Sequence, residues 1–232
     1  MKESFSNEIK AFFQEQLKEW SLAAKNYDAL KKVRTKEFDF NGYLFRVQFN
    51  PERIVSSAAK VDQKSLQERK CFLCPANLPA EQRGIPFGKD YQILVNPFPI
   101  FPVHFTIPSM HHRDQLILDR YEDMLDLAES MMEYVVFYNG PKCGASAPDH
   151  VHFQAGNKGF LPLEKDIRSV EKRVILSDED LLCYSPENYM RNVFIIESSN
   201  KKKVVALFER IYSALPIKKD ETEPMLNIVS YY

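Results

Sequence analysis

The segment Asp149-His150-Val151-His152-Phe153-Gln154 places two of the five histidines of the chain two residues apart. Residues 151–155 are mainly apolar, and residues 135–138 form a second apolar run that ends at the turn signal Asn139-Gly140. This pattern predicts an antiparallel pair of strands. Because side chains alternate along a strand, we expect His150, His152 and Gln154 to project side by side on one face.

Further strands and helices are expected around this pair. Residues 91–95 and 103–107 are predicted strands joined by a proline-rich segment, and residues 38–49 alternate with period two around the turn signal Asn41-Gly42. The remaining predicted elements are helices over 5–25, 119–132 and 203–215 and strands over 173–176, 193–196 and 227–231. We therefore expect an α+β fold in which an antiparallel sheet carries the histidines and the 119–132 helix packs on one face.

A metal site is predicted from the segment Cys71-Phe72-Leu73-Cys74. Two cysteines at this spacing present two thiolates to one tetrahedral zinc, and two imidazoles complete the ligand set. The histidines available for it are His150 and one of His111 and His112. Two reduced or buried thiols without a metal are the alternative, because this cysteine spacing is common and the partner histidines are distant in sequence.

A metal on His150 would leave His152 free for chemistry. A neutral imidazole attacks phosphorus without first losing a proton, and the phosphoramidate that it forms is labile enough to turn over. Gln154 can donate an amide hydrogen bond to a phosphate oxygen. The small residues of Gly144-Ala145-Ser146-Ala147 allow backbone N–H groups to approach a phosphate, and Ser146 adds a hydroxyl donor. The alternative is a pair of structural histidines on a core strand.

The motif Gly144-Ala145-Ser146-x-x-Asp149-His150-x-His152-x-Gln154 resembles the signature of the galactose-1-phosphate uridylyltransferase and GDP-hexose phosphorylase branch of the histidine-triad (HIT) superfamily. The resemblance implies a HIT-like fold and a covalent nucleotidyl intermediate on His152, with Gln154 holding the phosphate. It covers roughly residues 71–156. The residue between the two histidines is valine, which makes the motif closer to the GDP-hexose phosphorylases, and to a little-described bacterial family that resembles them, than to the uridylyltransferases.

Upstream segments resemble the same branch. Cys71-Phe72-Leu73-Cys74 resembles the zinc-binding cysteines of the uridylyltransferases, and Leu94-Val95-Asn96-x-x-Pro99 followed by His104-Phe105-x-Ile107-Pro108-x-x-His111 resembles the nucleotide-binding strand pair. The resemblance implies that Asn96 lies near the ribose or base and that a structural zinc is held by Cys71, Cys74, His111 and His150. On the residues alone, Asn96 is equally well explained as a turn residue before Pro97.

Further residues are predicted near the substrate. His104 lies within an apolar strand, where it either orients a neighbouring site residue or is a satisfied core histidine. Lys158 follows Gln154 closely and is predicted to neutralise phosphate charge. The predicted substrate-binding set is Asn96, Gly144, Lys158 and His104, and the predicted catalytic set is His152, Gln154 and Ser146.

One active-site block is visible, whereas the uridylyltransferases usually have two superfamily repeats. We expect residues 1–232 to form a single HIT-like nucleotidyltransferase domain, in which the helix over 5–25 precedes a core over about 38–232. The strand over 227–231 ends without a turn or a polar tail, which fits either the N-terminal part of a longer protein or an ordinary edge strand. Its apolar edge predicts pairing with a partner chain, as in a homodimer, or with further residues.

Composition limits the partners. Lys plus Arg number 31 against 32 for Asp plus Glu, so no overall basic field attracts nucleic acid. No apolar run approaches a membrane span or a signal peptide, so a cytoplasmic protein without a membrane partner is expected. The expected function is nucleotidyl transfer or phosphorolysis on a nucleoside diphosphate sugar or related nucleotide, with a phosphate or sugar phosphate as acceptor. The alternatives are a HIT-type nucleotide hydrolase and a zinc-stabilised nucleotide-binding module without turnover.

Overall fold

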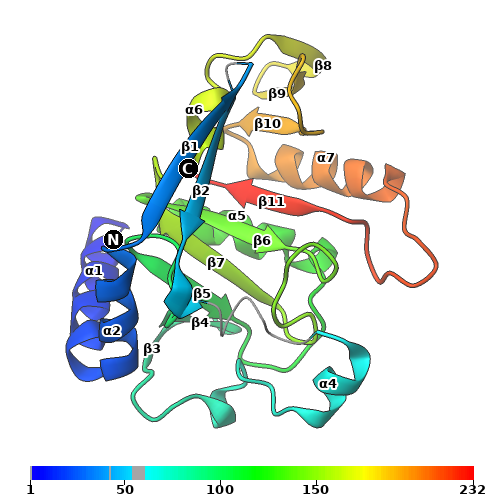
Figure 1. The fold of residues 1–232 in the computed structure, drawn as a ribbon. Coiled ribbons are helices and arrows are strands. Elements are labelled where there is room, and N and C mark those ends of the chain that lie inside the picture. The colour runs from blue at the N-terminus through cyan, green and yellow to red at the C-terminus, as the bar shows by residue number, and fades with distance from the viewer. Residues whose placement is uncertain (1, 42, 54–60) are drawn as a thin grey trace. The chain divides into compact units, whose positions relative to one another are not determined.

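The structure, a computed structural model, describes residues 2–41, 43–53 and 61–232 (Figure 1). The chain divides into two compact units. The first comprises Met1–Lys36, Val47–Lys158 and Ile217–Tyr232, and the second comprises Glu37–Arg46 and Gly159–Pro216. None of the described helices is long and apolar enough to cross a membrane.

The first unit is built on a six-stranded antiparallel sheet with the order β11-β6-β7-β5-β4-β3. Its strands are β3 (Gly84–Phe87), β4 (Tyr91–Val95), β5 (His104–Pro108), β6 (Tyr134–Asn139), β7 (His152–Asn157) and β11 (Asn227–Ser230). The predicted antiparallel pair is confirmed as β6 and β7, and the strands over 91–95 and 103–107 are confirmed as β4 and β5. The sequence does not predict β3, because its residues Gly84 and Pro86 are unfavourable in most strands. Such residues are tolerated mainly at the edge of a sheet, where β3 lies.

The predicted C-terminal strand is confirmed as β11, which forms one edge of this sheet. Val229 of β11 is 37% exposed. An edge strand presents backbone groups that can pair with another chain. Pairing of β11 with a partner remains a prediction.

Strand register places the candidate site residues on one face of this sheet. Thr106 of β5 lies opposite Gln154 of β7, and His152 shares the face of Gln154 because it is two residues away. By the same alternation, Phe105 and Phe153 point to the other face, where both are fully buried. One face therefore holds a core layer and the other holds the chemistry.

Helices pack against the sheet of the first unit. α1 (Lys2–Glu19) and α2 (Ser21–Leu30) contact each other, and the ring of Phe13 lies 5.8 Å from the ring of Phe105. α5 (Tyr121–Ser130) packs against β6 and β11. The helix predicted over 5–25 is interrupted at Trp20, which has extended backbone angles and a buried indole. Packing of this one side chain overrides the helical periodicity.

The second unit contains a three-stranded antiparallel sheet with the order β10-β9-β8. Its elements are α6 (Pro162–Asp166), β8 (Lys172–Asp178), β9 (Leu181–Pro186), β10 (Ile195–Ser198) and α7 (Lys201–Ala214). The predictions over 173–176, 193–196 and 203–215 correspond to β8, β10 and α7. Strand β9 has no matching prediction, because it is buried or half-buried along its length and its sequence does not alternate.

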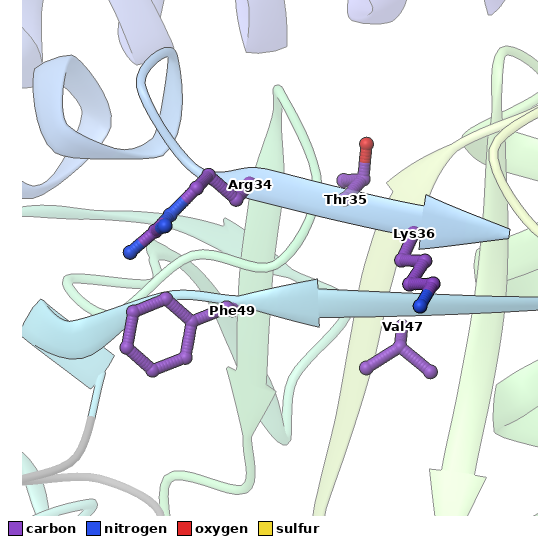
Figure 2. A pocket seen from close by; sticks show the side chains of 5 residues that line it. All are labelled: Arg34, Thr35, Lys36, Val47 and Phe49. Carbon is purple, nitrogen blue, oxygen red and sulfur yellow. The ribbon is translucent and has the colours of Figure 1, made fainter.

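The predicted hairpin over 38–49 is confirmed as β1 (Arg34–Phe40) and β2 (Tyr43–Phe49), although residue 42 of its turn lies outside the described residues. The hairpin carries a hollow of about 370 Å³ lined by Arg34, Thr35, Lys36, Val47 and Phe49 (Figure 2). The guanidinium carbon of Arg34 lies 5.5 Å from the centre of the Phe49 ring. None of the predicted site residues lines this hollow, so it is distinct from the candidate functional site.

Candidate functional site

Four side chains form a compact group, namely Cys71, Cys74, His112 and His150, whose donor atoms all lie within 4.8 Å of one another. The Nδ1 atoms of the two histidines are 3.3 Å apart, and the two sulfurs lie 3.2 and 3.6 Å from Nδ1 of His150. Metal bonds of about 2.0–2.3 Å to nitrogen and sulfur give a tetrahedron with edges of about 3.3–3.8 Å. These three separations are close to such edges, so the two sulfurs and two ring nitrogens form a possible metal-binding group.

The hydrogen bond of His150 decides which of its ring nitrogens faces the group. Nε2 of His150 lies 2.8 Å from the carbonyl oxygen of Ser109. Because a carbonyl only accepts, Nε2 carries the proton and donates it, which leaves the lone pair on Nδ1 beside the sulfurs. Burial lowers the pKa of His150, and the neutral ring is the form that binds a metal.

The thiol of Cys74 is better suited to bind a cation than to act as a nucleophile. Burial, followed by the neighbouring sulfur of Cys71, raises the pKa of the Cys74 thiol to about 11. A thiol with a raised pKa is a poor nucleophile at pH 7. A bound metal ion reverses this effect, because it deprotonates the thiols that coordinate it.

The third ligand implied by the resemblance, His111, is replaced in the structure by His112. Nδ1 of His112 lies 3.3 Å from Sγ of Cys74, whereas His111 is exposed and its backbone N–H donates to Oγ of Ser109 at 3.1 Å. Within the described part of the chain, the group contains His112 and not His111. Strand β5 ends at Pro108, so the side-chain direction of both histidines is set by the loop and not by strand alternation.

An ion pair beside the metal group holds the loop of small residues. Arg69, which follows α4 (Gln63–Glu68), contacts Asp149 at 2.9 Å and donates to the carbonyl of Ser146 at 3.2 Å. The side chains of Arg69 and Asp149 are only 21% and 18% exposed. Gly144 has a φ of +103°, a region that favours glycine. The loop is therefore fixed through its backbone, and a role for the hydroxyl of Ser146 remains a prediction.

His152 is the first residue of β7 and is almost fully buried. Its Nδ1 lies 2.8 Å from the carbonyl oxygen of His150, so Nδ1 carries the proton and the lone pair is on Nε2. Burial lowers the pKa of His152 to about 4, and the ring is neutral at pH 7. The predicted row of three side chains needs one correction, because His150 precedes β7 and turns toward the cysteines. Only His152 and Gln154 share the strand face.

A chain of hydrogen bonds orients Gln154. The backbone N–H of Ile100 donates to Nδ1 of His104 at 3.2 Å, so the other ring nitrogen, Nε2, carries the proton of the neutral ring. Nε2 of His104 then donates to Oε1 of Gln154 at 3.0 Å, and the amide NH₂ of Gln154 is presented as a donor. Burial lowers the pKa of His104 to about 3, which keeps its ring neutral. His104, a member of the predicted substrate-binding set, is fully buried and contacts Gln154. Binding of substrate by His104 stays a prediction.

Phe101 packs over His104. Its ring lies 5.3 Å from the ring of His104 and 5.6 Å from that of Phe137. Gly156 of β7 allows this contact, since a Cβ at that position would lie 2.4 Å from the Phe101 ring. A glycine is therefore needed in the middle of the sheet to keep the support of His104 in place.

Two predicted substrate-binding residues, Asn96 and Lys158, bond to other groups of the protein, and their binding of substrate stays a prediction. Asn96 donates to Oγ1 of Thr106 at 2.9 Å and accepts the N–H of Phe98 at 2.9 Å, so its side chain closes the turn after β4. Lys158 lies beyond the far end of β7 from His152, which at the rise of a strand is roughly 20 Å away. Its Nζ donates to the carbonyl of the last residue of the chain at 2.6 Å. The structure therefore does not bring Lys158 to the histidine.

Gln115 is a site residue that the sequence analysis missed. It is fully buried, and its side chain bonds to the backbone of His152. It stands in a polar stretch outside every motif, where an exposed glutamine is the ordinary expectation. No sequence pattern marks the residue, because its partner is 37 positions away.

The metal group can be tested with two adjacent histidines. We expect the purified parent protein and His111→Ala to contain about one zinc per chain, and His112→Ala to lose most of it, since only His112 lies beside the sulfurs. Elemental analysis after dialysis measures the metal directly. Loss of zinc in His111→Ala with retention in His112→Ala would reverse the assignment of the third ligand.

The fold and the site together define an α+β protein in which one strand presents a histidine and a glutamine beside a Cys₂His₂ group. The chain belongs to the family described as "Domain of unknown function (DUF4922)", whose model matches residues 12–157. The match includes the cysteines, both histidines of the motif and Gln154. The family description assigns no activity.

Comparison with characterised proteins gives more distant relatives. A galactose-1-phosphate uridylyltransferase of Clostridium acetobutylicum is 26% identical over 194 residues, which cover 76% of this chain. The chain spans only 38% of the length of that relative. This match supports the resemblance to the uridylyltransferase branch of the HIT superfamily.

Solved structures of yeast Ap4A phosphorylase Apa2 are also similar. The complex with AMP has a TM-score of 0.48 and 18% identity, with 93% of this chain and 76% of that chain covered. A second structure of the same protein has a TM-score of 0.49 and 16% identity, with 90% and 77% covered.

Proposed function

We propose that this chain transfers a nucleotidyl group through a covalent intermediate on Nε2 of His152. The observation that carries the proposal is the hydrogen bond from Nδ1 of His152 to the carbonyl of His150 at 2.8 Å. This bond selects the tautomer whose lone pair is on Nε2, the nitrogen available for attack. The match to a uridylyltransferase supports the same class of reaction.

The proposed first step forms a bond between Nε2 of His152 and the α-phosphorus of a nucleoside diphosphate sugar or related nucleotide. The bond from that phosphorus to the bridging oxygen breaks, and the departing phosphate or sugar phosphate keeps the electron pair. Attack makes the imidazole ring positive. The carbonyl of His150 then accepts a stronger hydrogen bond from Nδ1, which stabilises the charge that develops.

The proposed second step regenerates the histidine. An oxygen of an acceptor phosphate or sugar phosphate attacks the phosphorus, the phosphorus–nitrogen bond breaks, and its electrons return to Nε2. The amide NH₂ of Gln154 supports this proposal, because it is held as a donor two residues along the same strand face. In both steps it would donate to a phosphate oxygen that does not leave.

Zinc in this proposal is structural. A zinc ion bound to Cys71, Cys74, His112 and His150 would join the cysteine segment to the two segments that carry these histidines. Four protein ligands would leave no open position for water. The protein itself then fixes the backbone of His150, whose carbonyl orients the nucleophile. Gly144 and Ser146 are proposed to contact the phosphate groups of the substrate, because their loop leads directly into the segment from Asp149 to Gln154.

Intact-mass spectrometry after incubation with a panel of nucleoside diphosphate sugars tests the proposal. We expect a mass increase equal to one nucleotidyl group with one base, and peptide mapping should place it on His152. Nucleoside monophosphates are the control, because they lack a leaving phosphate and should give no adduct. An adduct on another residue, or tight nucleotide binding without any adduct, would contradict the proposal, and the second outcome favours a binding module.

A further inference from the structure

Gln115 has a position that the proposed mechanism does not use. Its side chain is fully buried. Its Oε1 accepts the backbone N–H of His152 at 2.7 Å, and its Nε2 donates to the carbonyls of His152 and Asn139, each at 3.0 Å. One amide therefore satisfies three backbone groups around the histidine.

The strand register explains why an amide is needed there. Strands β6 and β7 pair from Tyr134 opposite Asn157 to Phe137 opposite Gln154. Continuing this register by two residues would place Asn139 opposite His152. At that point the side-chain amide of Gln115 bridges the backbones of Asn139 and His152. Its hydrogen bonds take the place of the backbone–backbone bonds that two directly paired strand residues would make.

The backbone around Gln115 is also hydrogen-bonded to the segment before His152. Its N–H donates to the carbonyl of Pro148 at 3.1 Å, and the carbonyl of Arg113 accepts the N–H of Val151 at 2.7 Å. The segment from His112 to Gln115 thus runs beside the segment that leads into His152. It links a residue of the metal group to the backbone of the histidine.

We infer that Gln115 is a positioning residue for His152, an inference that rests on the proposed function. The imidazole of His152 is oriented by a carbonyl only two residues earlier, so the ring can hold its direction only if the backbone from 150 to 152 is fixed. Gln115 fixes both the N–H and the carbonyl of His152. A displacement of about 1 Å at a reacting group is enough to slow a reaction roughly 100-fold.

The test replaces Gln115 with methionine and uses Gln16 as a matched control. Gln16 is also fully buried, and its side chain also bonds to backbone in both directions: it donates to the carbonyl of Glu81 and accepts the N–H of Arg83. We expect Gln115→Met to slow single-turnover labelling of His152 about 10- to 100-fold at saturating nucleotide, with little change in nucleotide affinity. Gln16→Met should lose comparable thermal stability and label at the parent rate. Slow labelling in Gln115→Met together with parent-like labelling in Gln16→Met would distinguish a positioning role of Gln115 from a purely structural one.

Two further measurements keep the outcomes distinct. Nitrogen-15 NMR of the imidazole should show a single tautomer, protonated on Nδ1, in the free parent protein and a mixture in Gln115→Met. If the parent labels and Gln115→Met labels equally fast, the inference is wrong and the proposed function stands. If the parent never labels, the proposed function fails and the NMR spectrum alone decides whether Gln115 orients the ring. Should Gln115→Met not fold, Gln115→Asn keeps a neutral amide on a side chain one methylene shorter, and the same comparisons apply.

Discussion

His152→Gly is expected to abolish the nucleotide adduct completely and to leave the zinc content of the protein unchanged. The reason is that the two other buried imidazoles, His104 and His150, already have both ring nitrogens engaged. His104 already donates from Nε2 to Gln154, and His150 donates from Nε2 to a carbonyl while its Nδ1 faces the sulfurs. Intact-mass spectrometry and elemental analysis on the same sample measure both effects.

Stability has to be monitored in this variant. His152 is almost fully buried, so its removal leaves a cavity and costs about 2–4 kcal/mol of unfolding free energy. The melting temperature should therefore fall while the protein remains folded at 25 °C. His111→Ala is the control, because this exposed histidine lies outside the metal group and should label like the parent. Labelling of His152→Gly at the parent rate would remove the proposed nucleophile.

Much of the first unit could be predicted because its strands alternate or form short apolar runs. β4, β6 and β7 each carry such a pattern, and the turn signal Asn139-Gly140 marks the end of β6. The interruption at Trp20 could not be predicted from periodicity. The apolar spacing continues through Trp20, and only the tertiary packing of its indole shows where the helix ends.

The candidate site could be predicted to the level of residue types but not to the level of contacts. The spacing of His152 and Gln154 follows from strand alternation, whereas the hydrogen bond from His104 to Gln154 joins residues 50 positions apart. The choice between His111 and His112 depends on the loop that follows β5. Spacing rules do not describe loops, so sequence alone leaves both histidines available.

His150→Ala is expected to have the opposite profile to His152→Gly, with loss of both zinc and stability. His150 is fully buried, it supplies one donor atom to the metal group, and its Nε2 bonds to Ser109. A metal present at about 1,000 times its dissociation constant stabilises the folded state by about 4 kcal/mol. For a chain of this size, that loss lowers the melting temperature by roughly 8–16 °C.

A chelator gives the control for this prediction. Removal of the metal from the parent protein should lower its melting temperature by a similar amount, and the same chelator should have no further effect on His150→Ala. His150→Ala should also lower the melting temperature more than His112→Ala does, because His112→Ala leaves the bond from His150 to Ser109 intact. If the chelator removes zinc from the parent without changing its melting temperature, the metal does not stabilise the fold. The backbone of His150 would then be held without the metal, through bonds such as that from its N–H to the carbonyl of Ala147 at 3.1 Å, and zinc would have no part in aiming His152.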